Sequence, residues 1–374
     1  MDFAFSEEQR ELGTVVRSLL TELWDETEVR RLAATELGWD PALVRRCATE
    51  VGIQGMAVPE RFGGAGYGVV ELGVIFTELG RALVGGPFLA SVGLATPAIL
   101  ASADDHAAAD LLPGLAAGET VATLALVEES GSWDPTAVTS TARAAEEGWV
   151  LEGTKEYVLD GASADLLLVV AAGPSGPGLF AVDVATAADT LDRTPLNVVD
   201  PTRKQARITL RDTPARLVGT EGGAAEPVRQ ALRIGAVLLA AEQVGGAERV
   251  LEISVEYAKV REQFGRAIGS FQAIKHKCAD MLLRIEAARS ASAYALWAAD
   301  RSPENLPQAA AIAKSYCSEA FSFCAGQNLQ IHGGMGFTWE HSAHLYLRRA
   351  KTGESLLGSP REHRAALAGL AGIG

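Results

Sequence analysis

The hydrophobic pattern of the chain changes twice, and these changes constrain the fold more than any single motif does. Residues 6–118 carry apolar side chains at helical spacing, preceded by a polar N-cap at Ser6. Residues 119–216 instead contain short β-rich runs separated by Gly, Pro and Asp turns, and helical spacing returns from Ala224 onward. The sequence therefore predicts an α+β multi-domain fold with an N-terminal α-helical domain (1–118), a middle β-barrel or β-sandwich domain (119–216) and a C-terminal four-helix bundle (217–374).

Six runs predict the strands of the middle domain. They are rich in β-branched, aliphatic and aromatic residues and read VATLALV, WVLEGT, EYVLDG, DLLLVVAA, LFAVDV and ARITL. At 374 residues the chain is long enough for two or three domains with a sizeable core.

Charge and hydropathy exclude several classes of protein. A net charge of -14 and a pI near 5.0 argue against a nucleic-acid-binding protein, because such proteins need a basic face. No charged and then apolar leader opens the chain, and its longest apolar run, Ile234–Ala241, is too short to span a membrane. The four cysteines lack C-x-x-C spacing, so we expect reduced, packed thiols and a cytoplasmic location.

A helix with a break in its middle is expected between residues 257 and 281, YAKVREQFGRAIGSFQAIKHKCADM. The R-x-Q-F-G segment interrupts it at Arg261, Gln263 and Phe264, and a new helix is expected from Phe271 and Gln272. The segment places a cation, an amide and an aromatic ring close together, a grouping suited to a phosphate and a flat ring beside it. This pattern predicts a dinucleotide site without a Rossmann fold.

A second block, QIHGGMGF at residues 330–337, ends another helical run. Its glycines let backbone N–H groups approach a ligand closely. With both blocks in view, the chain resembles the acyl-CoA dehydrogenase family. In that family the two blocks form one site, which holds the adenosine pyrophosphate end of an FAD bound mainly by a neighbouring subunit. Carried over position by position, the resemblance assigns this role to Arg261, Gln263, Phe264, Gln330, Gly333 and Gly334.

The resemblance covers essentially the whole chain. Four further blocks occur in the order of the family: the opening segment up to Leu20, MAVPERFGGAGYG at 56–68, GTKEYVLDG at 153–161 and HLYLRRAK at 344–351. Several blocks in the right order are a strong signal, whereas one alone is weak.

The resemblance also implies where a catalytic base should lie. The family removes a proton α to a thioester carbonyl with a carboxylate, while the β-hydrogen leaves as hydride to the flavin. The usual glutamate position falls on Leu357 here, and the alternative position on the first long C-terminal helix falls on Gly235. Glu242, seven residues later among apolar neighbours, is the candidate base. The alternative is a structural carboxylate paired with Arg249 or with a residue on another helix.

The segment that contacts the flavin ring in relatives departs from the family pattern. Relatives carry T-E-P-x-A-G-S-D where this chain has VEESGSWD at 127–134, so Ser132 is the remaining hydroxyl. The usual W-I-T-N-G becomes Tyr157 to Gly161, which keeps an aromatic residue and loses the Thr hydroxyl. The sequence thus predicts an intact adenine half and an altered isoalloxazine half, with Ser132 and Tyr157 as its remaining contacts.

Three functions fit these residues. The first is an FAD-dependent acyl-CoA dehydrogenase with Glu242 as its base, acting in lipid metabolism and passing electrons to electron-transfer flavoprotein. The second is a non-catalytic partner subunit of a hetero-oligomeric dehydrogenase, of the kind associated in this family with bulky steroid-type acyl-CoA substrates. The third is a dehydrogenase or oxidase that acts on a carrier-protein-bound acyl group. All three predict a homo- or hetero-oligomer. A metal site at Glu340, His341 and His344 is not expected, because their spacing matches no usual zinc pattern.

Overall fold

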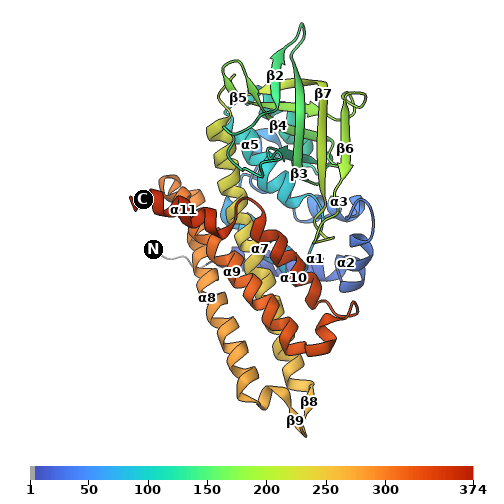
Figure 1. The fold of residues 1–374 in the computed structure, drawn as a ribbon, viewed down its shortest axis with the longest axis vertical. Coiled ribbons are helices and arrows are strands. Elements are labelled where there is room, and N and C mark those ends of the chain that lie inside the picture. Colours follow the sequence, from blue (N-terminus) through green and yellow to red (C-terminus); the bar gives the residue numbers. More distant parts are fainter. Residues whose placement is uncertain (1–4, 374) are drawn as a thin grey trace. The chain divides into compact units, whose positions relative to one another are not determined.

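The computed structural model describes residues 5–373 and confirms the predicted order of helices, strands and helices (Figure 1). Ser6 caps the first helix as predicted: its side chain accepts a hydrogen bond from the Gln9 backbone, and the Gln9 side chain accepts one from the Ser6 backbone. The N-terminal helices are α1 (Glu7–Leu23), α2 (Glu26–Ala33), α3 (Pro41–Glu50), α4 (Val69–Arg81), α5 (Thr96–Ala101) and α6 (Asp105–Ala116), with a π-helical segment at Phe88–Ala95 before α5.

The strands close into a barrel. Neighbouring strands pair in the order β4, β2, β3, β7 and β5, and β5 pairs again with β4, while β1 and β6 add to β4 and β7. Buried aliphatic and aromatic side chains such as Leu151, Val169, Phe180 and Ile208 fill the interior. The strands are β1 (Ala122–Ala125), β2 (Thr141–Ala144), β3 (Trp149–Leu159), β4 (Leu166–Gly173), β5 (Gly176–Asp183), β6 (Leu191–Pro195) and β7 (Gln205–Val218).

Two details of the barrel differ from the sequence prediction. The runs WVLEGT and EYVLDG are one strand, β3, whose pairing with β7 shifts register between Lys155 and Val158. Strands β2 and β6 were not predicted, because they are largely solvent-exposed and lack an apolar run. The irregularity in β3 holds Tyr157 at φ 55°, with its side chain half exposed.

The C-terminal helices confirm the predicted helix break. Helix α7 (Ala225–Val260) ends one residue before Arg261, a short hairpin of β8 (Glu262–Gln263) and β9 (Arg266–Ala267) follows, and α8 (Gln272–Arg301) begins where predicted. The remaining helices are α9 (Leu306–His332), α10 (Ala343–Ser355) and α11 (Pro360–Leu370). In the described part of the chain, no helix combines the length and apolarity needed to cross a membrane.

The chain forms two compact units, each packed mainly within itself. A helical unit consists of residues up to Arg30, Val69–Val84 and the chain from Ala236 onward, and a barrel unit consists of Arg31–Gly68 and Gly85–Gly235. Helices α1 and α4 therefore belong with the C-terminal helices, although they lie in the N-terminal part of the sequence. The domain boundaries predicted at residues 118 and 216 stay a prediction.

Within the helical unit, α4 and α7 cross at two glycines. A Cβ at Gly80 would lie 2.0 Å from the Glu242 carbonyl oxygen, and one at Gly245 would lie 1.8 Å from the Thr77 carbonyl oxygen. Only hydrogen fits at these positions, so the two backbones touch directly. This crossing fixes the part of α7 that carries Glu242.

Candidate functional site

The hairpin between α7 and α8 presents an aromatic ring to solvent. Glu262 pairs with Ala267 and Gln263 with Arg266, which leaves a two-residue turn of Phe264 and Gly265, both with positive φ. Phe264 is 92% exposed although it is a bulky residue in the left-handed region, a conformation that costs about 1–3 kcal/mol. Strain and exposure together leave the turn accessible to a ligand or another chain.

The hairpin also carries cations. Arg261 and Arg266 are exposed, and the Arg266 guanidinium lies 4.2 Å from the centre of the Phe271 ring, which Phe264 approaches edge-on at 6.1 Å. Gln263 is exposed, and its amide donates to the Glu262 carbonyl. A phosphate and a flat ring would find guanidinium and aromatic partners here.

The glycine block forms an open turn after α9. The helix ends at His332, Gly333 takes φ 57° and ψ -134°, and Gln330 is exposed one turn earlier. A Cβ on Gly333 or Gly334 would meet nothing within 4 Å, so packing does not explain either glycine. The open space lies directly over backbone that a ligand could approach.

Contacts between α7 and α9 bring the two motifs together. The Tyr257 ring stacks on His332 with centroids 4.3 Å apart, and its hydroxyl lies 3.7 Å from the Met335 sulfur. Ser254 donates to the Asn328 side chain at 2.8 Å, one turn below the glycines. Burial lowers the pKa of His332, which favours the neutral imidazole beside the glycine turn. The positive charge of the candidate site therefore comes from the hairpin arginines.

Ser132 and Tyr157, the predicted ring contacts, belong to the barrel unit. The Ser132 hydroxyl accepts a hydrogen bond from the Asp134 backbone at 3.1 Å, within a local turn. The Tyr157 ring is half exposed at the irregularity of β3.

The sequence interpretation missed a buried ion pair in the barrel. Lys155 is fully buried and its ammonium lies 2.6 Å from the Glu128 carboxylate, which also accepts hydrogen bonds from Thr139 and Ser140. Burial lowers the pKa of Lys155 to about 8. Burial would raise the pKa of Glu128, but hydrogen bonds from Lys155, Thr139 and Ser140 outweigh it and lower the pKa to about 2. A signal existed: Lys155 shares the inward face of β3 with Leu151, where a lysine needs a partner.

Neither family position for the base carries a proton acceptor. Gly235 lies buried within α7, in the barrel unit. Leu357, in the helical unit, is buried at φ 58° in the loop between α10 and α11. That loop is well held, since the His363 ring bonds the Leu357 carbonyl at 2.8 Å and buried Lys314 donates to the Gly358 carbonyl at 3.0 Å. The loop geometry is therefore built around a side chain that cannot accept a proton.

Glu242 is buried and ion-paired. Its carboxylate accepts a hydrogen bond from the Arg349 guanidinium at 2.9 Å, and the two side chains are 5% and 2% exposed. Arg349 also donates to the Val84 carbonyl at 3.0 Å. The predicted apolar surroundings are present, but the partner is Arg349 of α10 rather than Arg249, which pairs with Glu252 at 3.2 Å. This geometry favours the structural interpretation of Glu242.

The helical unit shows no metal-site geometry near His341. Its ring lies 4.2 Å from that of His332, and burial lowers the pKa of both. Across residues 5–373, no group of three His, Cys, Asp or Glu side chains is arranged to hold a metal ion.

Comparison with protein families identifies the chain. The model described as "Acyl-CoA dehydrogenase, N-terminal domain" matches residues 6–119, and "Acyl-CoA dehydrogenase, C-terminal domain" matches residues 225–368. The chain belongs to the acyl-CoA dehydrogenase family. It is an oxidoreductase of that family, whose fold consists of an N-terminal helical domain, a central β-barrel domain and a C-terminal helical domain, and whose members bind FAD.

Individual relatives of this acyl-CoA dehydrogenase include proteins whose names join two components. The acyl-CoA dehydrogenase IpdE2 of Mycobacterium tuberculosis is 36% identical over 356 residues, 95% of either chain. The Tcur3481–Tcur3483 steroid ACAD is similar in structure, with a TM-score of 0.86, 33% identity and 98% of each chain covered. The ChsE4–ChsE5 complex of Mycobacterium tuberculosis gives a TM-score of 0.90 at 28% identity, with all of both chains covered.

Proposed function

We propose that this chain is the non-catalytic partner subunit of a hetero-oligomeric acyl-CoA dehydrogenase that acts on bulky, steroid-type acyl-CoA thioesters. The observation that carries the proposal is the buried ion pair of Glu242 with Arg349 at 2.9 Å. A general base must reach the substrate with a free lone pair, and a carboxylate sealed against a guanidinium does not meet this requirement. With Leu357 and Gly235 at the two family positions, the chain offers substrate no base at any of the places where the family keeps one.

The residues at the hairpin and the glycine turn support the role left to the chain. Arg261, Gln263 and Phe264 are exposed at the hairpin, and Gln330, Gly333 and Gly334 are exposed at the turn. They fit the adenosine pyrophosphate end of FAD, since guanidinium, aromatic ring and open backbone suit phosphate and adenine. When bound, the flavin supplies the electron sink. The residues of this chain hold one end of it and leave its ring to the catalytic subunit.

The relatives support assembly with a different chain. The Tcur3481–Tcur3483 and ChsE4–ChsE5 proteins each carry two components in their names, and the former is a steroid ACAD. Exposed apolar side chains surround the proposed adenine site, as expected for a surface that another subunit covers; they are Val260, Phe264, Met335, Phe337 and Trp339. Electron-transfer flavoprotein remains the predicted electron acceptor of the complex.

Flavin content tests the proposal first. Purified alone, the chain should be colourless, and co-expression with a catalytic acyl-CoA dehydrogenase subunit that assembles with it should give a yellow complex that bleaches with a steroid-type acyl-CoA. A yellow protein that bleaches when purified alone would contradict the partner role.

Glu242→Gln tests it a second time, in the assembled complex. A partner subunit should keep turnover within a few-fold, whereas loss of a true base should lower flavin reduction by roughly 10²- to 10⁴-fold. Glu78→Gln is the matched control, because Glu78 is also a buried glutamate of the helical unit, paired with Arg17 at 2.7 Å. A large loss of flavin reduction in Glu242→Gln alone would establish Glu242 as the base.

A further inference from the structure

The helical unit contains a cavity of about 370 Å³ whose lining includes no residue of the hairpin or the glycine turn. It lies between the end of α1, the start of α2, the end of α4, the middle of α7 and the start of α10. Its volume is within the range of roughly 300–1,000 Å³ that is typical of small-molecule pockets. None of its lining side chains takes part in the sites described above, and the one link to them is the Leu83 carbonyl, which accepts a hydrogen bond from Arg349 at 3.5 Å.

One part of the cavity wall is apolar. Trp24, Leu83, Ile253 and Leu345 line it, together with the buried ring of Tyr346. The Tyr346 hydroxyl donates to the Arg81 carbonyl at 2.6 Å. Burial raises the pKa of Tyr346 to about 12, although the nearby charges of Arg249 and Arg81 act in the opposite direction. The tyrosine therefore contributes a neutral ring to the wall at any ordinary pH.

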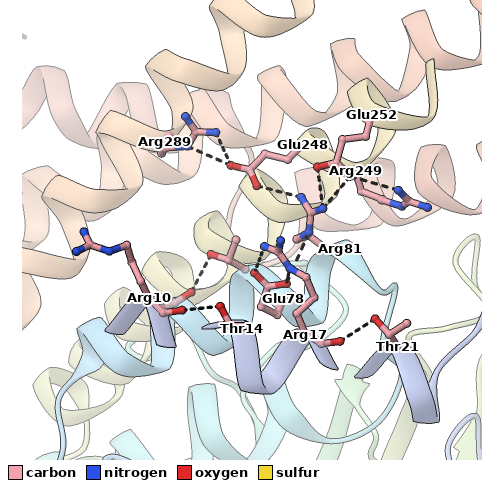
Figure 2. Close-up of polar contacts among 12 residues, drawn as sticks. Arg10, Thr14, Arg17, Thr21, Glu78, Arg81, Glu248, Arg249, Glu252 and Arg289 are labelled. Carbon is pink, nitrogen blue, oxygen red and sulfur yellow. Dashed lines mark hydrogen bonds and ion pairs between the residues drawn. The ribbon is translucent and has the colours of Figure 1, made fainter. Parts of the chain in front are cut away.

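The cationic part of the wall consists of Arg17, Arg81 and Arg249, and the glutamates that pair with them are not lining residues. Figure 2 shows these arginines and glutamates. Arg17 makes two hydrogen bonds to Glu78, at 2.8 and 2.7 Å. Arg81 reaches Glu252 at 2.7 Å and Glu248 at 3.2 Å. The glutamates thus fix the guanidinium groups in place without themselves lining the cavity.

Of the three arginines, Arg249 has the fewest contacts with carboxylates to neutralise its charge. Among the residues that the structure describes, it makes one ion pair, at 3.2 Å to a Glu252 carboxylate that Arg81 already binds through both oxygens, and one hydrogen bond to the Tyr346 hydroxyl. Its side chain is 38% exposed, so its remaining N–H groups can reach a ligand. A guanidinium with spare donors at the edge of an apolar wall suits a carboxylate on an apolar body.

The two acidic residues of the lining limit the charge of that ligand. The Asp25 carboxylate accepts a hydrogen bond from the Glu28 backbone, and Glu26 binds the Arg30 guanidinium at 2.7 Å. Both are engaged by groups of α2, yet their charges on the cavity wall oppose a doubly charged anion such as phosphate. A singly charged ligand is therefore favoured.

We propose that this cavity binds a small organic monocarboxylate, with its carboxylate on Arg249 and its apolar part against Leu83, Ile253 and Leu345. The proposal is independent of the partner-subunit function, because it involves neither the flavin residues nor Glu242. Its ligand is a free small molecule, and the cavity is a second binding site on a chain whose family site lies elsewhere.

Fluorine NMR with 4-fluorobenzoate as the probe tests the site on the full chain. The acid should bind, and 4-fluorobenzamide, which has the same shape without the charge, should bind at least about ten-fold more weakly, the loss expected for a charge-assisted hydrogen bond. Acetate, which lacks the apolar body, should displace the probe only at far higher concentration. Equal binding of acid and amide, or no binding of the acid at tens of millimolar, would overturn the proposal.

Two variants locate the site. Arg249→Gln should weaken binding of the probe at least about ten-fold. Arg289→Gln is the matched control, since Arg289 belongs to the same network through Glu248 at 2.7 Å but does not line the cavity, so binding should stay within about three-fold. Flavin retention in the assembled complex should be unchanged in both. Unchanged probe binding by Arg249→Gln, with its folding confirmed by circular dichroism, would refute the assignment.

Discussion

Removing either partner of the Glu242–Arg349 ion pair should destabilise the helical unit far more than removing both. Glu242→Met removes the carboxylate that faces the Arg349 guanidinium, which is 2% exposed and also donates to the Val84 carbonyl at 3.0 Å and the Leu83 carbonyl at 3.5 Å. Breaking a buried pair in this way costs about 3–5 kcal/mol, a large share of a total stability of about 5–15 kcal/mol. The double variant Glu242→Met with Arg349→Met removes both charges and places similar volume in the gap, so most of the loss should be recovered.

Urea unfolding followed by circular dichroism measures these free energies. The subunit concentration must be the same for all variants, because assembly makes stability concentration-dependent. In the cycle of wild type, two single variants and the double variant, the summed losses of the two single variants should exceed the loss of the double variant by about 5 kcal/mol or more. Single losses below about 1 kcal/mol that simply add in the double variant would show that the pair does not exist in solution.

Three further predictions concern the cofactor, the barrel and assembly. Arg261→Ala should weaken FAD retention by the complex about 10²-fold, because it removes a guanidinium from a partly desolvated pyrophosphate site; unchanged flavin occupancy after dialysis would count against the site. The Glu128 carboxylate has a folded-state pKa of about 2, below its ordinary value of 4.5, so its contribution to stability is present above pH 4.5 and is lost as the pH falls toward 2. Glu128→Gln should remove up to about 3 kcal/mol of this acid dependence in unfolding measured from pH 6 to pH 2, and a slope equal to that of wild type would contradict the ion pair. Light scattering at micromolar concentration should show at least a dimer, and a monomer that retains flavin would exclude a site shared between subunits.

The elements that the sequence predicted well are those with a strong local signal. The break at Arg261 and the new helix at Gln272 follow from the change of periodicity, and the structure confirms both. The cysteines are free, as expected, and three of the four are buried. Strands β2 and β6 were not predicted because pairing with long neighbouring strands, rather than their own composition, holds them in the barrel.

The polar core could not be predicted from sequence in the same way. Arg349 lies 107 residues from Glu242, and no periodicity indicates that these two side chains meet. The sequence narrowed the partner to Arg249 or a residue of another helix, and only the crossing of the helices decides between them. The cavity beside Arg249 depends on the same long-range packing, since its lining runs from Arg17 to Tyr346, which are 329 residues apart in the sequence.

The glycines at the crossing of α4 and α7 place helix propensity and backbone packing in opposition. Alanine is favoured over glycine inside a helix by about 1 kcal/mol, so a search for stabilising substitutions would select Gly80 and Gly245 first. A methyl group at either position would meet a carbonyl oxygen at 2.0 or 1.8 Å and force the helices apart. Since the carbonyls of Leu83 and Val84 follow α4 directly, the lifted helix would also withdraw acceptors from Arg349. An engineer seeking a more robust protein should leave both glycines alone and look for gains on the exposed faces of α8 and α11.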